Sequence, residues 1–162
     1  MENSCVTFGE VDSVDFAIYL NKKAKEKNLS VNVTQIQKWL YVCYGLYFAQ
    51  TARQLLTERP KAWDYGPAFP KVHRQQKKNN DTLDGLEVEG SLLKKYDDLV
   101  ELTLNTFGTW SAGQLVQWTH EENTAWDKKI KLGEKYGSLD NYDIMIDFKK
   151  YIEDSHSNGN RD

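Results

Sequence analysis

The chain has 162 residues, of which 40% are hydrophobic and 12% aromatic, enough for a single domain with its own core. Its formal net charge of -3 argues against a basic surface for nucleic acid. No apolar run approaches the roughly 20 residues that a membrane-spanning helix needs, and residues 1–6 lack the basic and apolar regions of a signal peptide. We therefore expect a cytoplasmic protein with neither a membrane nor a nucleic acid as its main partner.

Two helical patterns open the chain, and the second predicts the core. The first spans residues 13–27, with Asp12 or Ser13 placed to cap its start. The second spans residues 34 to about 50, where Thr34 and Gln37 fit a capping box. Its apolar residues lie nearly all round the helix, which is typical of a buried central element.

The segment 55–70 reads as extended chain and not as a helix, and it predicts a small β element near residues 55–66. Two short extended stretches, 55–57 and 61–65, precede a bend at Gly66 and Pro67. In an extended stretch the rings of Trp63 and Tyr65 share one face, and Asp64 points the other way.

The rest of the chain predicts further helices and a tail. Pro70 suits the first turn of a helix reaching Lys78, and Ser111 with Gln114 forms another capping box. The predicted helices span 70–78, 91–107, 111–119, 124–130 and 140–152. We expect a mainly α, compact, single-domain bundle around the central helix, covering residues 1–154 and followed by a disordered tail over 155–162.

Familiar catalytic patterns are missing from the sequence. There is no phosphate-binding glycine loop and no nucleophile elbow, and His120 with Glu121 is followed by Thr124 where a zinc-binding helix needs a second histidine. Cys43 sits in the most apolar helix, where a thiol is usually an inert packing residue. We therefore predict no catalytic, cofactor or metal site.

Opposite charges gather in neighbouring segments. The run 71–78 carries four basic residues, whereas segment 81–101 carries a net charge of -5. Either the two runs form an ordinary solvated surface, or they steer a charged protein partner.

Three motifs follow one another in a fixed order. They are K-x-L-Y at Lys38–Tyr41, A-W-x-Y-G-P-x-x-P at Ala62–Pro70, and L-x-x-x-T-H-x-E-x-x-x-W at Leu115–Trp126. Together they resemble the Panacea-domain family of SocA-like antitoxins and phage-associated proteins, over residues 11–152. The chain departs from the family pattern at Ala68, where valine is common, and at Ala125, where proline is usual.

The resemblance implies a non-enzymatic protein of bacteria and prophages, mainly helical and without a cofactor, that blocks a cognate toxin by direct binding. Because the expected disordered tail is short, we expect steric occlusion by a preformed surface, in an unknown oligomeric state. Three alternatives remain: an adaptor or scaffold that delivers a bound partner to host machinery, a hydrolase or nuclease built on His120 and Asp64, and DNA binding through Arg74, Lys77 and Lys78.

The motif residues are the candidate partner-binding positions. They are Lys38, Tyr41, Trp63, Asp64, Tyr65, Gly66, Pro67, Phe69, Pro70, His120 and Trp126. The aromatic side chains of the second motif either pack in a rigid core corner or form an exposed anchor for a toxin.

Two polar members of this set have predicted structural roles. We expect His120 to make a hydrogen bond that ties its helix to Trp126 or to the Gly-Pro corner. We expect Lys38 to pair with a carboxylate such as Asp64 or Asp15.

Overall fold

The computed structural model describes residues 9–159, and within that range it contains seven α-helices and one two-stranded hairpin. The elements are α1 (Ser13–Glu26), α2 (Val33–Thr51), β1 (Lys61–Trp63), β2 (Gly66–Ala68), α3 (Pro70–Lys78), α4 (Asp97–Phe107), α5 (Ala112–Thr119), α6 (Ala125–Lys131) and α7 (Asn141–Gly159). The predicted mainly helical class with a small β element is confirmed.

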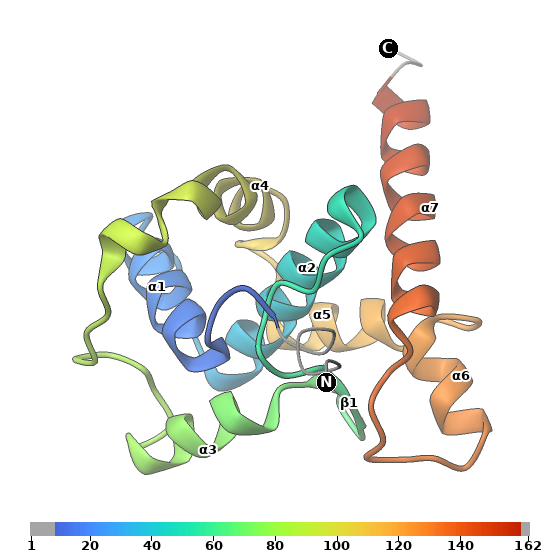
Figure 1. The fold of residues 1–162 in the computed structure, drawn as a ribbon, viewed down its shortest axis with the longest axis horizontal. Coiled ribbons are helices and arrows are strands. Elements are labelled where there is room, and N and C mark those ends of the chain that lie inside the picture. The colour runs from blue at the N-terminus through green and yellow to red at the C-terminus, as the bar shows by residue number, and fades with distance from the viewer. Residues whose placement is uncertain (1–8, 160–162) are drawn as a thin grey trace, which may run out of the picture.

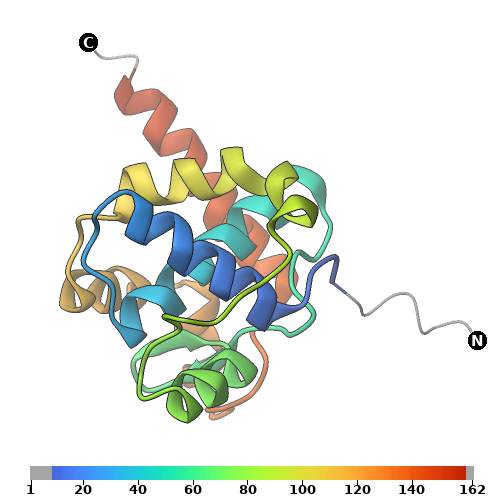
Figure 2. The ribbon, with the colours of Figure 1, turned by 90° about the vertical axis from the view of Figure 1, so that its left-hand side faces the viewer.

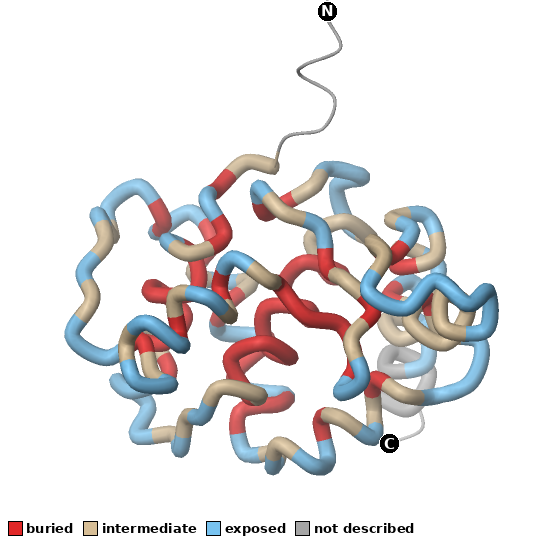
Figure 3. Tube along the Cα trace, turned by 90° about the horizontal axis from the view of Figure 1, so that it is seen from below, coloured by how far each residue is buried: buried red, intermediate tan, exposed pale blue. Residues whose placement is uncertain are grey.

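Helix α2 is the centre of the fold. Every residue from Gln35 to Leu46 is buried, as its all-round apolar pattern predicts. Helices α1 and α4 lie on one side of it and α5 and α7 on the other, while α3 and β2 also contact it (Figure 1). Seen from the left of that view, α1 and α4 lie next to each other (Figure 2). The buried stretch of chain runs through the middle of the molecule, surrounded by exposed segments (Figure 3).

Helix α2 begins at Val33, one residue before the predicted start, and its capping box lies two residues earlier than predicted. Its capping box is formed by Asn32 and Gln35, not by Thr34 and Gln37: the Gln35 N–H donates to Asn32 at 2.9 Å, and the Asn32 N–H donates to Gln35 at 3.0 Å. Asparagine is as good an N-cap as threonine or better, and it lets the helix begin at Val33.

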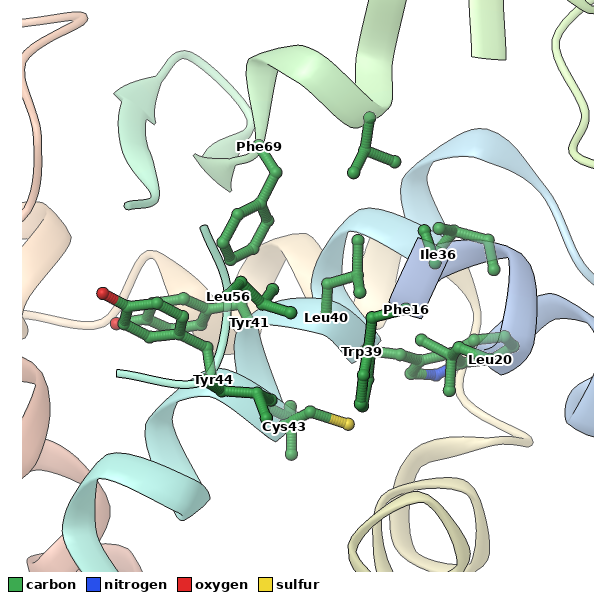
Figure 4. Close-up of a cluster of buried hydrophobic side chains, with 14 of the residues drawn as sticks. Phe16, Leu20, Ile36, Trp39, Leu40, Tyr41, Cys43, Tyr44, Leu56 and Phe69 are labelled. Atoms are coloured by element: carbon green, nitrogen blue, oxygen red, sulfur yellow. The ribbon is translucent and has the colours of Figure 1, made fainter. Parts of the chain in front are cut away.

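Buried side chains of α2 cluster with Phe16 and Leu20 of α1 and with Phe69 (Figure 4), and two of them also contact α4. The Trp39 indole donates to the Phe107 carbonyl at 3.2 Å, and Cys43 Sγ lies 3.3 Å from Thr103 Oγ1. Burial raises the pKa of the Cys43 thiol to about 12, so the group stays protonated. Cys43 is therefore a packing residue of the core.

The chain reverses earlier than the sequence predicts. Strands β1 and β2 are antiparallel with Trp63 opposite Gly66, so Asp64 and Tyr65 form the turn and do not continue an extended stretch. The reversal uses Gly66 at φ +104°, a left-handed conformation that favours glycine. Upstream, Leu56 makes only an isolated parallel bridge with Val11.

Two further segments differ from the prediction. The helix expected over 91–107 begins with two 3₁₀ turns, Gly90–Leu92 and Lys94–Tyr96, and becomes α-helical only at Asp97. The segment expected to be a disordered tail continues α7 through Gly159, because adding a residue to an existing helix costs far less than nucleating one. Residues 160–162 of that tail lie outside the described part of the chain. The end of α7 extends beyond the other helices (Figures 1 and 2).

None of the helices within residues 9–159 is both long and apolar enough to cross a membrane.

Gly45 tests the packing of α2 against α7. A Cβ atom at this position would lie 2.1 Å from the ring of Phe148, which is itself buried. Alanine is the better helix former by about 1 kcal/mol. We nevertheless expect Gly45→Ala to lower the free energy of unfolding by about 1–3 kcal/mol, because the overpacked contact outweighs helix propensity.

The matched control is Gly113→Ala in α5, where the nearest atom to a new Cβ lies 3.9 Å away. This variant is expected to unfold at the same urea concentration as the parent, or a higher one. Equal effects of the two substitutions in urea titrations would contradict the packing argument.

Candidate functional site

Three side chains from different parts of the chain hold the hairpin through its backbone carbonyls. Lys38 Nζ donates to Pro67 O at 2.9 Å, His120 Nε2 lies 2.8 Å from Asp64 O, and Trp126 Nε1 donates to Trp63 O at 2.7 Å. We call Lys38, His120 and Trp126 the hairpin clamp. They come from α2, the C-cap of α5 and α6, so the hairpin is fixed to three elements at once.

His120, the C-cap of α5, connects α5 and α6 to the turn of the hairpin. Its Nδ1 lies 2.7 Å from Val116 O and its Nε2 lies 2.8 Å from Asp64 O. Both partners are carbonyl oxygens, which only accept, so the ring nitrogen that carries the proton donates the hydrogen bond. The imidazole also packs against the ring of Trp126 at a tilt of 48°, with centroids 3.9 Å apart. The hydrogen bond that we expected from His120 to Trp126 or to the Gly-Pro corner is made instead to Asp64, two residues before Gly66, while Trp126 contacts the imidazole through its ring.

The proposed hydrolytic pair of His120 and Asp64 does not form. His120 meets the backbone carbonyl of Asp64, while the Asp64 carboxylate makes an ion pair with Lys135. No acid–base contact therefore links the two side chains. Among residues 9–154, whose side chains the structure describes, no group of three or more histidine, cysteine, aspartate or glutamate side chains is arranged to hold a metal ion.

Lys38 lacks the carboxylate partner that the sequence suggested. Its side chain is 2% exposed, and its one hydrogen bond goes to the Pro67 carbonyl. Asp64 pairs with Lys135 instead, and Asp15 lies exposed near the start of α1. Because burial disfavours the charged form, it lowers the pKa of the Lys38 ammonium to about 8.

The close approach of these elements requires a glycine at position 66. A Cβ there would lie 2.5 Å from Thr119 Oγ1 and 3.2 Å from Lys38 Cε. Together with the left-handed backbone, this contact excludes any side chain at Gly66.

The residues that follow the hairpin are part of the core. The Phe69 N–H donates to Gln37 Oε1 at 2.6 Å, and the Phe69 ring is fully buried, 5.8 Å from the ring of Tyr44. Pro70 occupies the first turn of α3, as predicted. Phe69 is thus a core residue and not an exposed anchor.

The outer end of the hairpin is open to solvent. Tyr65 is 73% exposed, and Asp64 beside it is bound by Lys135. Tyr136, next to Lys135, is 57% exposed and has φ +71°, a strained conformation for a bulky residue. We call Asp64, Tyr65, Lys135 and Tyr136 the hairpin tip. Backbone strain of this kind is concentrated at functional sites.

The remaining predicted residues line the inside of this site. Trp63 is half-buried, its ring 5.1 Å from His73, and Pro67 is buried beneath Lys38. Tyr41 is 4% exposed and packs edge-on against Phe148. Of the eleven candidate partner-binding residues, only Asp64 and Tyr65 are exposed.

Sequence reasoning missed Lys135 and Tyr136. They reach the hairpin because the Tyr136 N–H donates to Ala62 O at 2.8 Å and Lys61 bridges Ser138, contacts between segments more than 70 residues apart. No local pattern in the sequence marks them.

Comparison with known protein families identifies the family to which this chain belongs. The family model described as "Antitoxin SocA-like, Panacea domain" matches residues 36–127, a range that contains the whole hairpin clamp and both strands. The chain belongs to this SocA-like Panacea-domain family. Neither a curated protein nor a solved structure gives a match.

The buried ammonium of Lys38 predicts a pH dependence of stability. The folded-state pKa of about 8 lies below the ordinary value of 10.5, so between these pH values the unfolded chain binds more protons than the folded one. The destabilisation is therefore fully present below pH 8 and is relieved as the pH rises toward 10.5. The difference corresponds to about 3 kcal/mol.

We expect Lys38→Met to remove this contribution. The measurement is the free energy of unfolding by urea at several pH values from 7 to 10, for the parent and the variant. The parent should gain roughly 2–3 kcal/mol relative to the variant over this range. Parallel pH profiles would show that Lys38 is not buried as a charged group.

Proposed function

We propose that this protein is an antitoxin that neutralises a cognate protein toxin by direct binding, with the hairpin tip as its principal contact. The observation that carries the proposal is a 73% exposed Tyr65 on a hairpin whose backbone carbonyls are bound by three buried or half-buried side chains. Membership of an antitoxin family supports the choice of partner.

An exposed tyrosine is a suitable anchor for a protein partner. Tyrosine is among the residues that contribute most to binding energy, because it buries a large ring and keeps a polar hydroxyl. Tyr136 adds a second exposed ring beside Lys135, whose ammonium pairs with Asp64. The tip therefore offers aromatic contacts around a charged pair.

The hairpin clamp would lower the cost of binding. A two-stranded hairpin is marginally stable by itself, and ordering a loop during association reduces affinity. Here the turn carbonyls are already bound by His120 and Trp126. The proposed mechanism is steric occlusion of the toxin by a preformed surface, without a chemical step.

The proposed antitoxin unit extends beyond the matched range. Helices α1 and α7 both pack against α2, so residues 1–154 act as one domain in this proposal. The protein would act in the bacterial cytoplasm. Its gene would lie beside the toxin gene in a bacterial or prophage locus.

Tyr65→Ala tests the proposal. The chain would be co-expressed with the gene that lies next to its own, and neutralisation scored as growth. We expect loss of growth rescue and a loss of about 2 kcal/mol of binding free energy in titration of the purified pair. Because the Tyr65 side chain is mostly in solvent, the melting temperature should change little.

Leu92→Ala is the matched control, since Leu92 is 72% exposed on the 3₁₀ turn Gly90–Leu92, which is not part of the hairpin tip. This variant should neutralise the toxin as well as the parent does. Full neutralisation by Tyr65→Ala would contradict the proposed contact. Rescue that requires a host protease would favour an adaptor that delivers the toxin for degradation.

A further inference from the structure

A cleft of about 370 Å³ opens beside the hairpin, between α7 and the loop that joins α5 to α6. Aromatic side chains from three helices form much of its wall: Tyr41, Trp118, Phe148 and Tyr151. Thr119 links it to the hairpin, since it lines the cleft and also contacts Gly66. The cleft plays no part in the contacts that hold the hairpin clamp.

The charged side chains around the cleft are predominantly acidic. Four carboxylates line it, against the single ammonium of Lys150; the carboxylates belong to Glu121, Glu122, Asp147 and Asp154. Asp147 accepts a hydrogen bond from the Ala125 N–H at 2.7 Å. Within residues 9–154, no lysine or arginine makes an ion pair with Glu121, Glu122 or Asp154. The residues that line the cleft therefore carry a net negative charge.

A polar atom in the wall also lacks a partner. Tyr41 is 4% exposed and lines the cleft, yet its hydroxyl makes no hydrogen bond within the described part of the chain. Its neighbour Tyr44, which extends from α2 in a similar direction, donates to Asn141 at 2.7 Å (Figure 4). Burial, together with the charges of Asp147 and Asp143, raises the pKa of the Tyr41 phenol well above its usual value. A neutral hydroxyl is therefore available to a ligand.

We propose that this cleft binds an arginine or lysine side chain presented by a protein partner. The aromatic walls would receive the cation over their faces, the carboxylates would supply the opposite charge, and the Tyr41 oxygen would accept a hydrogen bond. Arginine is the favoured occupant, because its planar guanidinium stacks on rings and offers five donors. The negative charge excludes a nucleic acid as occupant.

This inference goes beyond the proposed function, because it defines a second surface with its own chemistry. Since the cleft and the hairpin meet at Thr119, one partner is able to contact both. A toxin that does so would place a basic residue close to the segment that binds Tyr65. The test below uses no toxin, so its result does not depend on the antitoxin assignment.

The experiment is a titration of the full ¹⁵N-labelled chain with three capped tripeptides, Gly-Arg-Gly, Gly-Lys-Gly and Gly-Gln-Gly. The readouts are the indole N–H of Trp118 and the backbone amides of residues 119–124. We expect saturable shifts with the arginine peptide, weaker ones with lysine, and none with glutamine. The double substitution Glu121→Gln/Glu122→Gln should lower the affinity for the arginine peptide by about threefold to fivefold.

Two further variants make the result specific. Glu87→Gln/Glu89→Gln removes the same charge from an exposed segment elsewhere and should leave the affinity unchanged. Tyr41→Phe keeps the ring but removes the hydroxyl, and should also weaken binding. Lysine binding as tightly as arginine would still support a cation site, recognised by charge alone. Equal shifts with glutamine, shifts only outside the cleft, or no saturable shift would each overturn the proposal.

Discussion

The hydrogen bond from the buried Lys38 ammonium to the Pro67 carbonyl is the contact on which the site depends. An ammonium out of water is costly, and here one hydrogen bond to a backbone oxygen offsets part of that cost. The bond connects the most buried helix to the second strand of the hairpin. Together with the hydrogen bonds of His120 and Trp126 to the carbonyls of Asp64 and Trp63, this bond restricts the movement of the turn. The position of Tyr65 in solvent follows from these contacts.

The buried Lys38 lowers the stability of the fold but fixes the position of the hairpin. A buried polar group that binds one specific partner selects one position of the hairpin, whereas an apolar side chain at the same place would tolerate several. Gly66 acts in the same direction, because only glycine lets Thr119 and Lys38 approach the strand so closely. A surface that binds without rearrangement suits an inhibitor, since the cost of ordering is met during folding.

The helical part of the fold could be predicted because its signals are local. Apolar spacing marked α2, and the capping residues Ser111 and Thr124 marked the starts of α5 and α6. The role of His120 was predictable in part, because a histidine at a helix end needs acceptors near the next corner, although its partner there is Asp64. Errors arose where two local signals competed: Asn32 and Thr34 both cap well, and the left-handed Gly66 moved the turn to Asp64 and Tyr65.

The surface features of the site depend on distant segments and could not be predicted. The partner of Lys38 is a backbone carbonyl, which every residue carries, so no residue type in the sequence indicates this contact. Lys135 and Tyr136 reach the hairpin only through pairing across the fold. The unpaired hydroxyl of Tyr41 likewise belongs to a cleft formed by helices far apart in sequence.

Amide hydrogen exchange of the chain, free and bound to the proposed toxin, tests the central claim most directly. A preformed hairpin held by the clamp predicts slow exchange of the Ala62 amide, which donates to Gly137 O, in the free protein. Binding should then add protection mainly at residues 64–66 and 135–136. A hairpin that exchanges rapidly when free and slowly only when bound, or protection confined to another face, would contradict a preformed binding surface at this site.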